Sequence, residues 1–129
     1  MAYLEARHLN WMGDLQAFVT REDTNKEKVV ASFDYLNQWL IKVDYRGCGF
    51  QNIIGDLPKD HIGISNQVLQ HKNSLRTWLR ALLKEDDVNN EAMADEVLVL
   101  IEGAIMLSQI QKDNWPIVMA KKNCVRLLS

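Results

Sequence analysis

The amino-acid sequence predicts an all-α fold of about six helices in a single domain. Apolar residues recur at spacings of three and four along most of the chain, and the segments between these stretches are short and hold capping or turn residues. The chain has 129 residues, of which 47% are hydrophobic and 25% charged, which is ordinary for a globular protein with a hydrophobic core. We therefore expect one domain over residues 1–129.

The first two helices are expected in the N-terminal third of the chain. The first runs from Ala2 to about Val19, where the apolar pattern gives way to a threonine and three charged residues. The second begins at Thr24, because Thr24 and Glu27 have the spacing of a capping box, in which hydroxyl and carboxylate each accept a backbone N–H. Its apolar stripe continues to Val43.

The later helices lie between clear stop signals. A short third helix is expected from Cys48 to Leu57, because Pro58 cannot continue it. Longer helices are then expected over residues 60–84 and 89–112. A sixth begins at Asn114, since Pro116 is tolerated only in a first turn.

The fifth predicted helix is unusual, because from Val97 to Leu107 its apolar residues point in nearly every direction around the axis. Such a helix needs cover on all sides. We expect one face to pack on its own domain and the opposite face on an identical chain in a two-fold dimer, with Gly103 and Ala104 allowing close approach. A helix at the centre of a monomer is the alternative.

Charge and cysteine content exclude several classes of protein. The 17 acidic and 15 basic residues give a net charge of −2, which argues against direct binding of nucleic acid. Cys48 and Cys124 cannot form a disulfide framework, which favours a reducing, cytoplasmic setting. The longest apolar run, Val97 to Ile101, is far too short for a membrane span, and we expect no membrane contact.

The sequence offers no catalytic constellation. The three histidines, His8, His61 and His71, lack metal-ligand spacing, and neither a nucleophile elbow nor a phosphate-binding glycine loop occurs. We therefore predict no enzyme, no metal and no cofactor.

Three polar features remain. His71 lies on the apolar stripe of the fourth predicted helix, and a hydrogen-bonded core histidine is favoured over a ligand contact. Asn52 stands among apolar neighbours, where it could orient a ligand or satisfy a backbone carbonyl. Basic residues also recur every four positions, which favours a solvated helix face over attraction of an acidic partner; they are Lys72, Arg76, Arg80 and Lys84.

The run from Arg46 to Leu57, RGCGFQNIIGDL, resembles a signature of TetR-type (tetracycline-repressor-like) transcriptional regulators, in which Gly-Cys is followed by Asn four positions on and an acid four further. The resemblance continues in order through residues 68–72, 75–79 and 94–104, and so covers about residues 46–107.

The resemblance implies the C-terminal domain of such a regulator, which senses a small molecule and dimerises. An apolar or aromatic effector would bind among the first four helices, at Trp11, Phe33, Leu36, Phe50, Asn52, His71, Leu75 and Trp78. The last two helices would form a four-helix bundle with a second subunit, through Val97, Leu100, Ile101, Ala104, Leu107, Cys124 and Leu128.

One departure from the family concerns DNA. Members of the family begin with a helix-turn-helix module, and no such pattern precedes Trp11. We expect the chain not to bind operator DNA by itself; with the module attached, an effector would change the spacing of the DNA-reading heads. The alternative function is a helical protein-interaction module with a filled core, an exposed apolar face on the fifth helix and no small-molecule ligand.

Overall fold

The computed structural model describes residues 2–45, 62–85 and 90–129, and within these ranges the chain forms five α-helices and no strand. The helices are α1 (Ala2–Val19), α2 (Asn25–Lys42), α4 (Ile62–Glu85), α5 (Asn90–Gln111) and α6 (Trp115–Leu128). The predicted all-α fold is confirmed for the described residues, and the helix expected from Cys48 to Leu57 lies outside them.

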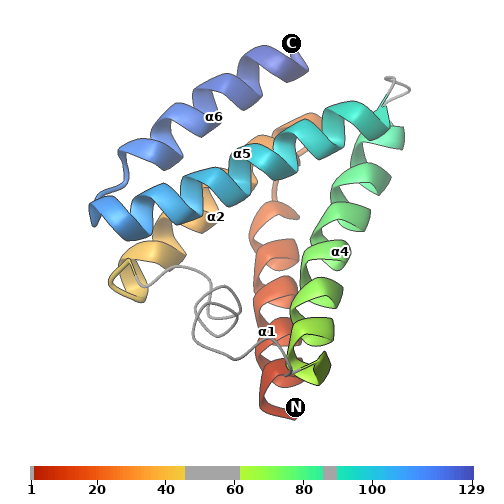
Figure 1. Ribbon diagram of the computed structural model, residues 1–129. Coiled ribbons are helices and arrows are strands. Elements are labelled where there is room, and N and C mark those ends of the chain that lie inside the picture. Colours follow the sequence, from red (N-terminus) through yellow and green to blue (C-terminus); the bar gives the residue numbers. More distant parts are fainter. Residues whose placement is uncertain (1, 46–61, 86–89) are drawn as a thin grey trace.

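The helices form two groups joined by α2. Helices α1 and α4 run side by side, and α5 and α6 lie next to each other across one end of that pair (Figure 1). Helix α2 packs against each of the other four, so it connects the two groups. No helix among the described residues is long and apolar enough to cross a membrane.

The two ends of α2 show how local sequence sets its length. The Thr24 hydroxyl accepts a hydrogen bond from the backbone N–H of Glu27 at 3.1 Å and donates one to the Glu27 carboxylate, also at 3.1 Å. The predicted N-terminal cap by the Thr24 hydroxyl is therefore confirmed, whereas the Glu27 carboxylate accepts from that hydroxyl and not from the predicted backbone N–H. At the other end Asp44 and Tyr45 adopt left-handed φ angles of 55° and 57°, and the Tyr45 N–H bonds the Leu40 carbonyl at 2.7 Å, which closes the helix.

The turn between α5 and α6 also follows the sequence. Lys112 takes a left-handed φ of 54°, and α6 begins at Trp115 with Pro116 in its first turn, as predicted. The Asn114 side chain does not cap the helix. Its amide instead donates to the Asn37 side chain of α2 at 3.3 Å, which ties the turn to the central helix.

The hydrophobic core lies where α2, α4 and α5 meet. Each helix contributes residues three or four positions apart, so that one stripe of each faces inward. The largest fully buried apolar side chains of these three helices are Val29, Phe33, Leu36, Leu40, Leu75, Leu79, Leu83, Val97, Ile101 and Ile105.

Candidate functional site

Trp11 of α1 is the centre of an aromatic cluster at the junction of α1, α2 and α4. Its ring makes edge-to-face contacts with Tyr35, Trp39 and His71, at centroid distances of 5.6, 5.9 and 5.2 Å. The Tyr35 hydroxyl donates a hydrogen bond to the Trp11 carbonyl at 3.3 Å. Trp39 of α2 joins the cluster through its contact with Trp11.

The polar atoms of this cluster are withdrawn from water. His71 is 2% exposed, and burial, with a smaller effect of the Asp14 charge, raises the pKa of Tyr35 to about 12, so its phenol stays protonated. The Trp11 Nε1–H is buried and has no acceptor among the described residues. Buried donors nearly always have a partner, so this group could donate to a ligand that carries an acceptor.

The predicted ligand residues fall into three groups. Phe33, Leu36 and Leu75 are fully buried parts of the core, whereas Phe50 and Asn52 lie outside the described residues. The remaining three, Trp11, His71 and Trp78, lie at the junction of α1 and α4, and the structure brings Trp11 and His71 into contact. That these residues bind an effector stays a prediction.

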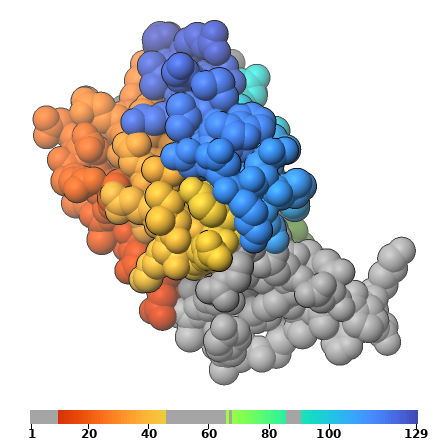
Figure 2. Space-filling model, turned by 90° about the vertical axis from the view of Figure 1, so that its left-hand side faces the viewer, coloured from red at the N-terminus to blue at the C-terminus, as the bar shows by residue number. Residues whose placement is uncertain are grey.

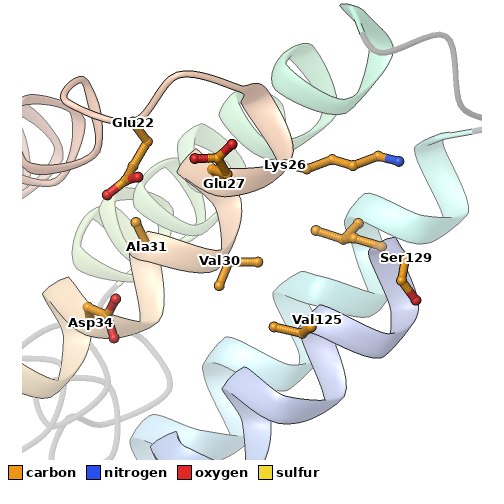
Figure 3. A pocket seen from close by; sticks show the side chains of 9 residues that line it. Glu22, Lys26, Glu27, Val30, Ala31, Asp34, Val125 and Ser129 are labelled. Carbon is orange, nitrogen blue, oxygen red and sulfur yellow. The ribbon is translucent and has the colours of Figure 1, made fainter.

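Three surface grooves border these helices. One of about 660 Å³ lies between α1 and α4 and includes Trp78, and one of about 550 Å³ lies between α1 and α2 and includes Trp39. A smaller groove of about 310 Å³ separates α2 from the end of α6 (Figure 3). Its apolar floor includes Val30 and Val125, and its rim carries charged side chains, among which Asp34 pairs with Lys121 at 2.9 Å.

The basic residues of α4 mainly face α5. Arg76 and Arg80 both bind the Asp95 carboxylate, at 2.8 and 2.9 Å, and Lys72 pairs with Glu102 at 2.9 Å. Hydrogen bonds from the two arginines hold the pKa of Asp95 well below its usual range. Arg76 and Lys84 are exposed, as a solvated helix face requires, whereas Lys72 and Arg80 are partly buried. The acidic partners of Lys72, Arg76 and Arg80 lie on the next helix of the same chain.

The outer face of α5 and α6 is apolar and exposed. On α5 the stripe consists of Val99, Met106 and Ile110, with Val99 71% and Ile110 66% exposed. Gly103 lies on the same stripe, and a Cβ atom added there would meet nothing within 4 Å. Helix α6 adds Trp115, Val118 and Met119, whereas its Val125 faces the groove beside α2. The exposed side of α6 also carries the charged residues Lys122 and Arg126. Figure 2 shows α6 and the neighbouring part of α5 on the surface beside α2.

The residues predicted for the dimer interface lie mostly on the opposite side of these helices. Leu107 is exposed and Leu100 partly buried, but the other five are buried against the chain's own helices: Val97, Ile101, Ala104, Cys124 and Leu128. Burial also raises the pKa of the Cys124 thiol to about 12, so it stays protonated and unreactive. The interface stays a prediction, and the surface available to it is the outer face described above.

Comparisons with known protein families, with curated proteins and with solved structures found no match for this chain. Within residues 2–45, 62–85 and 90–129, no three His, Cys, Asp or Glu side chains gather as a metal site would require.

Proposed function

We propose that the chain is the effector-sensing and dimerisation domain of a TetR-type transcriptional regulator. The observation that carries this proposal is the exposed apolar stripe of α5, formed by Val99, Met106 and Ile110, which the chain's own described helices leave uncovered. Large apolar side chains gathered on one exposed helix face are typical of an interaction site in a globular protein. The motif order from residue 46 to 107 supports the family on independent grounds.

A second copy of the chain is the partner that suits this face best. Two adjacent helices with apolar outer faces can meet the same pair on another subunit about a two-fold axis and form a four-helix bundle. Gly103 supports this arrangement. A mid-helix glycine destabilises a helix by about 0.5–1 kcal/mol relative to alanine. Within the described part of the chain no neighbouring atom lies close enough to require a glycine at this position, so a contact outside the chain would explain it.

The sensing half of the proposal rests on the cluster around Trp11. Its buried Nε1–H lacks an acceptor among the described residues, and the surrounding aromatic rings suit a small apolar or aromatic molecule that carries one hydrogen-bond acceptor. Helix α4 would carry the signal, because it holds His71 on one side and is paired with α5 through Asp95 on another. DNA would be contacted only through a helix-turn-helix module such as the family carries.

Native mass spectrometry tests both halves of the proposal. We expect a species of about twice 14.9 kDa, with added mass where an effector is retained. Val99→Asp should raise the dimer dissociation constant about 100-fold or more, because an unpaired carboxylate would be buried in an apolar interface. Leu69→Asp is the matched control, since Leu69 is 57% exposed on α4, away from the outer face, and should leave the dimer intact.

A helical protein-interaction module is the second candidate. It is favoured by the filled core around Phe33, Leu36 and Leu75, which leaves these three predicted ligand residues without open space. A monomer that retains no small molecule at any concentration would contradict the dimeric sensor and support a face that meets a different protein.

A further inference from the structure

The groove between α1 and α4 differs from its neighbours in that the described residues of its lining include no charged side chain. Met12 and Gln16 line it from α1, and from α4 come Gln70, Asn73, Ser74, Thr77, Trp78 and Ala81. The α1–α2 groove, by contrast, includes Asp14 and Lys42, and the α2–α6 groove has four charged residues at its rim. A quarter of all residues in this chain are charged, so a charge-free groove of about 660 Å³ is a distinct surface.

Helical phase explains why the groove is neutral. The basic residues of α4 recur every four positions on another side of the helix, where Arg76 and Arg80 are occupied by Asp95. The groove residues of α4 occupy positions i, i+3, i+4, i+7, i+8 and i+11 from Gln70, which is one face about three turns long. A charged ligand would therefore lose hydration in this groove without gaining a counter-charge.

Uncharged hydrogen-bonding groups dominate this face. The five polar side chains are two glutamines, an asparagine, a serine and a threonine, and every one can both donate and accept. The Ser74 hydroxyl donates a hydrogen bond to the backbone carbonyl of Gln70 at 2.9 Å. Gln16, Asn73 and Thr77 make no side-chain hydrogen bond to another described residue, so their capacity is available to a ligand.

Two apolar groups complete the groove. Met12 is buried beneath it, and the partly buried indole of Trp78 offers a flat apolar surface beside the amides and hydroxyls. A purely apolar ligand would cover Gln16, Asn73 and Thr77 without giving their side chains a hydrogen-bond partner, and that mismatch costs binding energy. A pyranose ring fits both parts, because its hydroxyls donate and accept around the rim while its C–H groups can lie on an aromatic face.

We propose that the α1–α4 groove is a binding site for an uncharged sugar. The amide and hydroxyl side chains of Gln16, Asn73 and Thr77 hydrogen-bond its hydroxyls, and Trp78 packs against the ring. The site includes Trp78, one of the residues predicted for the effector, but its hydrogen-bonding residues lie outside the cluster around Trp11, and the proposal does not depend on dimerisation. Its volume is within the range of small-molecule sites.

The test is titration of the full chain with neutral sugars, followed by isothermal calorimetry and ligand-observed NMR. The probes are glucose, galactose, mannose and maltose, each up to roughly 20 mM, which is well above the Kd of a millimolar site. We expect saturable binding of at least one of them. Glucose 6-phosphate and glucosamine are the charged comparisons and should bind more weakly than glucose or not at all.

Two exposed substitutions locate the site without disturbing the core. Thr77→Val and Asn73→Ala should each weaken sugar binding about three- to tenfold, the effect of one lost hydrogen bond. Gln38→Ala removes an exposed amide from the neighbouring α1–α2 groove and should change nothing.

The proposal is overturned by absence of saturable binding, by equal binding of charged and neutral sugars, or by binding that both groove variants leave unchanged. The monomeric Val99→Asp variant should retain sugar binding in full. An incorrect dimer interface and an incorrect sugar site would therefore give different results, because the first is tested by the dimer mass and the second by sugar binding.

Discussion

The two sides of α5 differ in whether their side chains have partners within the chain. Towards α4, charged residues at the edge of the helix are matched by partners on its neighbour, where Asp95 receives two arginines and Glu102 a lysine. Towards solvent, Val99 and Ile110 are large, apolar and mostly exposed. The first side is complete within one chain, whereas the second exposes apolar surface that burial would stabilise. The outer side of α5 is therefore the side available to a partner.

The largest expected effect is a difference in the free energy of unfolding between substitutions on the inner and the outer face of α5. Ile101→Ala removes a fully buried side chain and should lower the free energy of unfolding by about 2–5 kcal/mol, because it leaves a cavity. Val99→Ala, on the exposed face, should cost less than about 0.5 kcal/mol at concentrations where the chain is monomeric. Urea unfolding measures both, and similar losses for the two variants would contradict the assignment of faces.

Local signals were sufficient for the helix bounds but not for the faces. The first helix ends at Val19 as predicted. The cap at Thr24 and the position of Pro116 in the first turn of α6 are also as predicted, because each depends on a few neighbouring residues. The inner face of α5 could not be chosen in this way. A helix that is apolar all round has no periodic signal, so Ile101 and Val99 look alike until the other helices are placed.

Contacts between distant residues explain the other differences. The pairs of Asp95 with Arg76 and Arg80 span 19 and 15 positions, and the i, i+4 spacing of the basic residues holds no information about which helix lies opposite. The contact between Trp11 and Trp39 joins two different helices in the same way, so no pattern within either helix predicts it. A signal that could have found the ion pairs is the acidic spacing of Asp95 and Glu102 on the following helix.

A smaller effect is expected from Gly103→Ala, which lies on the outer side of α5. This substitution should stabilise the monomer but weaken the dimer. In a Val99→Asp monomer, Gly103→Ala should raise the free energy of unfolding by about 0.5–1 kcal/mol, since alanine favours the helix and the added Cβ meets no neighbour. In the otherwise unchanged chain the same methyl group should raise the dimer dissociation constant, measured by sedimentation. Tighter dimerisation of Gly103→Ala would show that α5 does not cross its copy at this position.

The smallest effect concerns the charged side of α5 and is a dependence on pH. Because the arginines lower the pKa of Asp95 in the folded chain, the folded state binds fewer protons than the unfolded state below about pH 5. The stabilisation is therefore present above the ordinary carboxyl pKa of 3.8 and is lost as the pH falls below it. The melting temperature of the wild-type chain should consequently fall more steeply on acidification than that of Asp95→Asn.

Replacing both arginines by glutamine is the matched control, because it removes the cause of the shift while leaving the carboxyl in place. That variant should lose the same acid-dependent part of the stability. The groups are partly exposed, so 1 M salt should also reduce the difference between wild type and Asp95→Asn. Equal acid dependence of all three chains at low salt would mean that the Asp95 pairs add nothing to folding, and the α4–α5 contact would then depend on its apolar residues and the Lys72–Glu102 pair.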